Sequence, residues 1–160
     1  MRAEEEKYRQ MSPKEHVLYN PSMYIGPVVP QVKEMRYFDE ETRSIRVREM
    51  EIAQGFCGIF DEILMNAADN FFHSQDVRMT QVEVCVGKAA ISVRNDGRGI
   101  PIRKHADTDM YIPQLIFSEW LTSSNYATKN RITGGMNGQG AKLTNIFSTH
   151  FEVELSLIHI

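Results

Sequence analysis

The chain has 160 residues, of which 42% are hydrophobic and 24% charged, and its formal net charge is −3. These values are typical of one globular domain with a sizeable core, and they argue against a sequence-independent nucleic-acid surface, which needs a basic excess. No apolar run reaches the roughly 18 residues of a membrane span, and no apolar segment follows the charged N-terminus, so we expect neither a membrane helix nor a secretory signal.

The first predicted element is a short helix near the N-terminus. Ser12-Pro13-Lys14-Glu15 is a capping box with proline at the first helical position, and the helix should continue to about Tyr19. Asn20-Pro21 should end it, because the residue before a proline disfavours helical backbone. Residues 23–27 are then expected to form an apolar loop with a turn.

Two β-hairpins are predicted from strands that flank short turns. Residues 32–38 and 45–50 are expected to be the strands of the first hairpin. Residues 80–86 and 89–94 are expected to form the second, because their apolar residues alternate with polar ones around the tight turn at Gly87-Lys88.

The longest predicted helix covers residues 55–72 and carries two different faces. Helical spacing gives an apolar stripe for the core, made of Phe56, Phe60, Ile63 and Ala67. It also gives a neighbouring polar row, made of Glu62, Asn66, Asp69 and Asn70. Asn and Asp are poor helix formers, and a solvated face would usually carry cations, so this row indicates a functional role, with a solvated face as the alternative.

Both cysteines of the chain lie in elements predicted to be buried. Cys57 belongs to the long helix and Cys85 to the second hairpin, and they form no CxxC motif. We expect structural thiols in a reducing compartment.

Two glycine-rich stretches follow. Asn95-Asp96-Gly97-Arg98-Gly99-Ile100-Pro101 comes directly after a strand, and its glycines allow the backbone to approach a ligand, with a simple turn as the alternative. Gly134–Lys142 opens a predicted helix at 141–147, and a helix N-terminus reached through glycines binds phosphate. Its pattern is GxxGxG, which is neither a Walker A loop nor GxGxxG, and a flexible linker is the alternative.

The remaining predicted elements lie on either side of the second glycine-rich stretch. A helix is expected from Pro113 to Leu121, followed by a polar loop at 122–126. The last predicted element is a strand at 151–155, after which the chain ends abruptly.

Three motifs occur in a fixed order: the helix with the polar row, the strand that ends in DxGxG, and the GxxGxG loop that opens a helix. In this order they resemble the GHKL or Bergerat-fold ATP-binding domain. The resemblance is closer to one family, the N-terminal ATPase domains of eukaryotic type IIA DNA topoisomerases. It covers about residues 10–155. The segments that carry it are 16–26, which is similar to that family's N-terminal strap, and 60–70, 121–125, 134–142 and 145–149.

The resemblance implies an α+β fold, a two-layer sandwich in which helices cover one face of a mixed, mostly antiparallel sheet. It implies a strap at 1–27 and an ATP-binding domain at 28–160 that is incomplete at its C-terminus. The family's transducer domain, which supplies a lysine to the γ-phosphate, would then be absent. We therefore expect the fragment to bind ATP but to hydrolyse it very slowly.

The resemblance also implies residue roles. Glu62 would be the general base that orients the attacking water, and Asn66 the ligand of Mg²⁺. Asp96 would accept a hydrogen bond from the adenine amino group, although eukaryotic relatives usually carry asparagine there. Tyr24 would reach the nucleotide of the partner subunit.

Further nucleotide contacts are implied in the polar row, the two glycine-rich stretches and the polar loop between them. They are Asn70, Gly99, Ile100, Ser123, Ser124, Asn125, Gly135, Asn137, Gly138, Gln139, Gly140, Ala141 and Lys142.

The function that the resemblance implies is the ATP-binding and ATP-hydrolysing part of a DNA topoisomerase, which drives strand passage by ATP-dependent closure of a homodimer. ATP and Mg²⁺ would be the cofactors, DNA would be bound through the full-length enzyme, and the location would be the nucleus or an organellar nucleoid. The alternatives are a non-catalytic nucleotide-binding and dimerisation module, or another GHKL protein such as a chaperone or a MutL-like factor.

Overall fold

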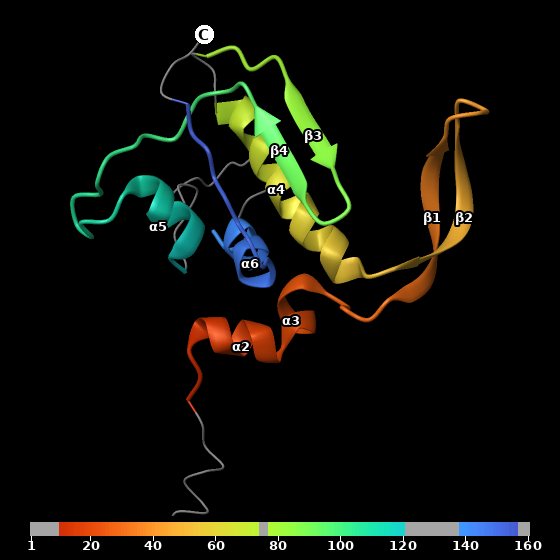
Figure 1. Ribbon diagram of the computed structural model, residues 1–160, viewed down its shortest axis with the longest axis horizontal. Helices are drawn as coiled ribbons and strands as arrows, with labels where there is room; N and C mark the ends of the chain where they lie inside the picture. Colours follow the sequence, from red (N-terminus) through yellow and green to blue (C-terminus); the bar gives the residue numbers. More distant parts are fainter. Residues whose placement is uncertain (1–9, 74–76, 121–137, 157–160) are drawn as a thin grey trace, which may run out of the picture.

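The computed structural model describes residues 10–73, 77–120 and 138–156, and it has the predicted α+β composition (Figure 1). Its helices are α2 (Pro13–Tyr19), α3 (Pro21–Ile25), α4 (Gln54–His73), α5 (Ile112–Ser118) and α6 (Gly140–Phe147). Its strands are β1 (Gln31–Asp39), β2 (Ser44–Ile52), β3 (Val82–Val86) and β4 (Ile91–Asn95). No helix in these ranges is long and apolar enough to cross a membrane.

The strands form two separate antiparallel hairpins rather than the single mixed sheet that we expected, as far as the described residues go. In the first hairpin β1 pairs with β2, and in the second Val82 of β3 lies opposite Asn95 of β4. Figure 1 shows β3–β4 lying along α4, whereas β1–β2 extends away from the rest of the molecule. The first hairpin is therefore mostly exposed, and Arg48 stacks on Tyr37 on its surface, with the guanidinium 4.4 Å from the ring centre.

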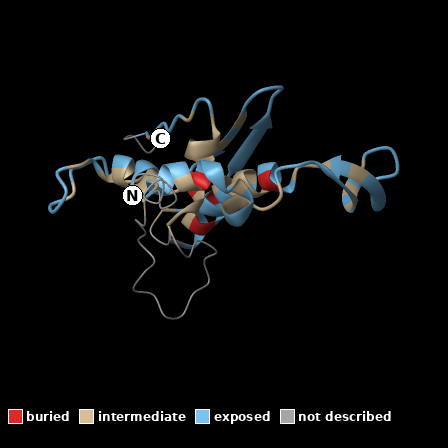
Figure 2. Cartoon of the chain, turned by 90° about the horizontal axis from the view of Figure 1, so that it is seen from below, coloured by how far each residue is buried: buried red, intermediate tan, exposed pale blue. Residues whose placement is uncertain are grey.

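Helix α4 is the longest of the described helices, and elements from three parts of the chain pack against it. It contacts α3, α6 and β4. Among the described residues, the buried apolar side chains come from four segments, which Figure 2 marks in red; they are Val17, Ala67, Met79, Ala141 and Leu143.

The predicted apolar stripe of α4 is only partly buried. Ala67 is 5% exposed, but Phe56, in the first turn, is 60% exposed. The prediction for Phe56 was wrong because helical periodicity fixes the side of the helix but not how far along it the packed neighbours reach.

The N-terminal helices show one confirmed prediction and one correction. The capping box is formed, with the Ser12 hydroxyl and the Glu15 carboxylate each bonded to the other residue's backbone N–H. The expected loop at 23–27 is wrong, because α3 begins directly at Pro21 and ends before Gly26, whose φ is +84°. Proline at the first helical position starts this turn just as Pro13 starts α2.

The predictions for the C-terminal part need further corrections. Residues 151–156 form no strand, since a strand requires a paired neighbour and none of the described strands pairs with them. Helix α5 ends at Ser118 rather than at Leu121, which lies outside the described residues. Cys57 and Cys85 are free thiols, but both are exposed rather than buried.

Candidate functional site

The polar row of α4 runs along one side of the helix, between Gly140 of α6 at one end and the turn at Gly97 at the other. Glu62, Asn66 and Asn70 are spaced four residues apart, so the row is about 12 Å long. Glu62 and Asn66 are exposed and Asn70 is half-buried. Asp69, which we had placed in the same row, is only 8% exposed and therefore faces the interior.

The Glu62 end of the row lies against the N-terminus of α6. A Cβ atom at Gly140 would be 2.7 Å from Cδ of Glu62 and would overlap its carboxylate, so only glycine fits here while Glu62 keeps this position. Although Glu62 as a whole is exposed, its carboxyl group is partly shielded from water. Burial, followed by the negative charges of Asp61 and Asp69, raises the pKa of Glu62 above its ordinary value.

The Asn70 end of the row is tied to the first glycine-rich stretch. The Asn70 side-chain amide donates to Oδ1 of Asn95 at 2.7 Å and to the backbone carbonyl of Arg98 at 3.2 Å. Gly97 approaches so closely that a Cβ atom there would lie 2.7 Å from Nδ2 of Asn70. This loop therefore needs glycine because α4 passes directly beside it.

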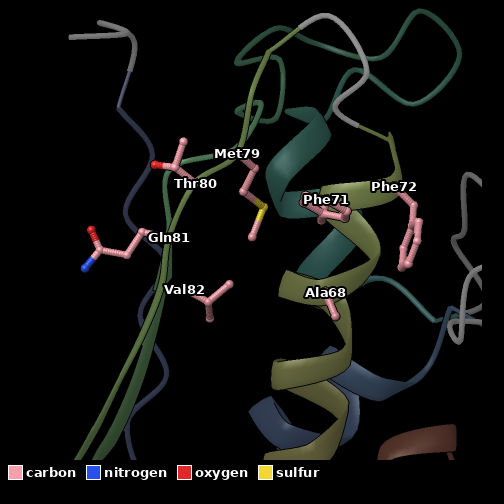
Figure 3. A pocket seen from close by; sticks show the side chains of 7 residues that line it. All are labelled: Ala68, Phe71, Phe72, Met79, Thr80, Gln81 and Val82. Carbon is pink, nitrogen blue, oxygen red and sulfur yellow. The ribbon is translucent and has the colours of Figure 1, made fainter.

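Asp96, which was expected to contact adenine, does not take part in this arrangement. Its Oδ1 accepts from the backbone N–H groups of Thr80 and Gln81, both at 2.8 Å, and its Oδ2 accepts from the Thr80 hydroxyl at 2.5 Å. Figure 3 shows the side chains of Thr80 and Gln81 pointing away from α4. Because the Thr80 hydroxyl donates to the Asp96 carboxylate, that carboxylate lies with it on the far side of the hairpin from α4.

Asn95 is the residue that our sequence reasoning missed. Side chains alternate along β4, with Ile91, Val93 and Asn95 half-buried and the residues between them exposed. Because a strand has a period of two, Asn95 shares the α4-facing side with Val93, and its neighbour Asp96 cannot. The alternation of Ile91 and Val93 was visible in the sequence and could have identified Asn95.

The contacts of Asp96 predict a titration at unusually low pH. Hydrogen bonds from Thr80 and Gln81 lower the pKa of Asp96 from 3.8 to about 2. The folded chain therefore keeps the ionised form at a pH where the unfolded chain is protonated, so this stabilisation is complete above about pH 4 and is lost as the pH falls through about 2. We expect the amide NMR signals of Thr80 and Gln81 to titrate with a midpoint near that value, and not to do so in Asp96→Asn. A midpoint at the ordinary value would contradict the contacts.

The second glycine-rich stretch leads into α6. Gly138 has a φ of +60°, and its carbonyl accepts from Nζ of Lys142 at 2.5 Å. Lys142 is 3% exposed, and burial lowers its pKa, although the charge of Glu119 opposes this. The Thr144 hydroxyl donates to the carbonyl of Ile59 at 2.9 Å and so holds α6 against α4.

The other predicted contacts are placed as follows. Gln139 is the N-cap residue of α6, Ala141 is buried in its first turn, and Gly99 and Ile100 follow the Asn70 contacts in the first loop. Five predicted contacts lie outside the described residues: Ser123, Ser124, Asn125, Gly135 and Asn137.

Tyr24 lies away from the row, within the N-terminal segment. Its hydroxyl is 2.7 Å from Nδ1 of His16, and its ring meets Trp120 edge-on at 6.3 Å between ring centres. In this single chain the tyrosine therefore packs on residues of its own subunit.

The two best-formed cavities of the described residues lie elsewhere. One, of about 280 Å³, is lined by residues of α4 and by residues 79–82 at the start of β3, among them the apolar Phe71, Met79 and Val82 (Figure 3). The other, of about 390 Å³, lies where the base of the first hairpin meets α4. Neither cavity is lined by the charged and amide side chains of the row. The row is therefore the better candidate on chemical grounds.

The polar row fits a magnesium ion that is bound together with a phosphate-containing ligand. Asn66 is exposed in the middle of the row, and the described residues contain no group of three or more His, Cys, Asp or Glu side chains that would hold a metal on its own. Mg²⁺ usually keeps one or two protein oxygens and takes its other ligands from phosphates and water. The row as a whole is suited to a ligand with an anionic end near α6 and a flat, hydrogen-bonding end near Asn95.

Comparison with known proteins gives consistent results. No family model matches the chain. DNA topoisomerase 2 of Candida albicans is 49% identical over 150 residues, which are 93% of this chain and 10% of that protein. The ATPase region of Saccharomyces cerevisiae topoisomerase II has a similar structure, with a TM-score of 0.86 and 44% identity over 91% of this chain and 39% of that one.

A second solved structure agrees. The ATPase and transducer domains of DNA topoisomerase II from Balamuthia mandrillaris give a TM-score of 0.82 and 42% identity, covering 88% of this chain and 36% of that one. The chain thus spans about a tenth of the length of the curated relatives it matches.

Proposed function

Because the chain belongs to the type II DNA topoisomerase family, whose ATPase region it matches in sequence and in fold, we propose that its polar row binds Mg-ATP. Within a longer protein, hydrolysis of this ATP would drive the passage of one DNA duplex through another. The observation that carries the proposal is that one side of α4 is bracketed by Gly140 at one end and Gly97 at the other, with Glu62, Asn66 and Asn70 between them.

The phosphates would lie at the α6 end. The first N–H groups of α6 have no partner within the helix, and they carry the positive end of its dipole. Lys142 adds a cation in the first turn, although it is buried and donates to Gly138. We propose that Lys142 shapes the loop and neutralises phosphate charge without touching the phosphate, while the backbone amides make the direct contacts.

Glu62 would be the general base. Its raised pKa makes it a stronger proton acceptor than an ordinary carboxylate, and its contact with Gly140 fixes it beside the phosphate end of the row. Asn66 lies one turn further along α4 and would hold Mg²⁺, which would neutralise charge on the phosphates.

The adenine ring of ATP would lie at the other end of the row, near Asn95 rather than Asp96. Both oxygens of Asp96 already accept hydrogen bonds on the far side of the hairpin, whereas Asn95 faces α4 and contacts Asn70. An asparagine is also the residue that we expected eukaryotic relatives to carry at the adenine contact, and Asn95 stands one position before Asp96.

The remaining parts of the proposal concern the assembly. Residues 1–27 would be a strap and 28–160 the ATP-binding domain, and two copies would close as a homodimer on binding ATP. Tyr24 would then leave His16 and Trp120 to contact the partner's nucleotide. DNA would be bound by the longer protein, and the protein would act in the nucleus.

Calorimetric titration of the chain with ATP, with and without Mg²⁺, tests the proposal. We expect binding that Mg²⁺ strengthens, and we expect Asn66→Ala to weaken Mg-ATP binding by about tenfold, the size of one charge-assisted contact. Gln114→Ala, an exposed amide on α5, is the matched control and should not change affinity. Absence of ATP binding by the unaltered chain, or an equal effect of both variants, would contradict the proposal.

A further inference from the structure

We propose that Asp96 and Thr80 form a latch that positions the loop Asn95–Gly99 for nucleotide binding. In this role Asp96 does not touch the nucleotide. It is a positioning residue that acts through the loop, and the inference rests on the function proposed above.

The latch continues the β3–β4 hairpin beyond its last backbone pair. The ladder ends where Val82 lies opposite Asn95, and the next residue along, Asp96, donates its backbone N–H to the Gln81 carbonyl at 3.3 Å. The Asp96 carboxylate then accepts from two backbone N–H groups and from the hydroxyl of Thr80, at distances of 2.5 to 2.8 Å. A side chain thus replaces ladder hydrogen bonds at the point where the backbone turns away into the glycine loop.

The same loop is held from its other side by α4. Asn70 donates to Asn95 and to the Arg98 carbonyl, and the Gly97 N–H donates to Oδ1 of Asn95 at 3.2 Å. The loop contains two glycines and is otherwise free to take many backbone conformations. Fixing it from both faces reduces the ordering that nucleotide binding would otherwise have to bring about.

The residue types suit this task. A carboxylate only accepts, so each of its two oxygens can receive the N–H and O–H donors that face it. Asparagine would turn an NH₂ group toward one of these donors and lose part of the contact. Charge-assisted hydrogen bonds of this kind are also stronger than neutral ones.

The test compares Asp96→Ala, Thr80→Val, the double variant and the conservative Thr80→Ser. Hydrogen exchange at the Gly97 and Gly99 amides is measured without nucleotide, and affinities for ATP and GTP are measured by calorimetry. We expect faster exchange and about five- to tenfold weaker ATP binding in each of the first two variants, no further loss in the double variant, and near-normal values for Thr80→Ser. The ratio of ATP to GTP affinity should stay constant, because the latch does not read the base.

Two results would overturn the latch. One is unchanged exchange at Gly97 and Gly99 in both single variants. The other is a changed ATP-to-GTP ratio in Asp96→Ala together with normal binding in Thr80→Val, which would mean that Asp96 contacts the base directly. If the unaltered chain binds no nucleotide, the proposed function fails, but the exchange measurement still decides whether the latch exists.

Discussion

Replacing Glu62 by glutamine is expected to slow ATP hydrolysis by roughly a hundredfold to ten-thousandfold while changing ATP affinity little, because general-base catalysis contributes that much to a rate. Glutamine keeps the shape of the side chain and its place against Gly140, but it cannot take a proton from water. Single-turnover hydrolysis of labelled ATP, with the chain in excess, measures the chemical step directly.

The pH profile and a control carboxylate separate this role from a general loss of charge. Because the pKa of Glu62 is raised, the acidic limb of the rate profile should lie above the ordinary value of 4.5, and it should disappear in Glu62→Gln. Glu83→Gln, on the exposed outer face of β3, should leave the rate unchanged. Normal turnover by Glu62→Gln, or a loss of affinity as large as the loss of rate, would show that Glu62 is not the base.

Much of the fold was predictable because its signals are local. The capping box at Ser12 and the alternating residues of the second hairpin act over a few positions, and the structure contains both elements. The helix at 21–25 was missed because Asn20-Pro21 was interpreted only as an end, although the same proline also starts the next helix. The strand at 151–155 was predicted wrongly because strand formation depends on a paired neighbour, which a local pattern does not reveal.

The candidate site shows the same division. Helical periodicity places Glu62 and Asn70 on one side of α4, and the structure brings each of them against a glycine. The contact between Asp96 and Thr80 joins residues 16 positions apart, and no sequence motif predicts it. The expectation for Asp96 came from matching a motif without checking strand parity, which was available from Ile91 and Val93.

Gly140→Ala is expected to lower ATP turnover by roughly a hundredfold, close to the effect of losing Glu62 itself, with little loss of folding stability. The new methyl group would occupy the position of the Glu62 carboxylate, which must then swing away from the phosphate end of the row. The side chain is flexible enough to do so, and alanine is favoured over glycine in a helix by up to about 1 kcal/mol, so the free energy of unfolding should change little.

A double variant makes this prediction decisive. If Gly140→Ala acts by displacing Glu62, then Glu62→Gln combined with Gly140→Ala should be no slower than Glu62→Gln alone, because the second change removes nothing further. Thermal unfolding of both single variants checks that each is folded. If the two effects instead multiply, Gly140 contributes separately from Glu62, most directly through the approach of phosphate to the first N–H groups of α6.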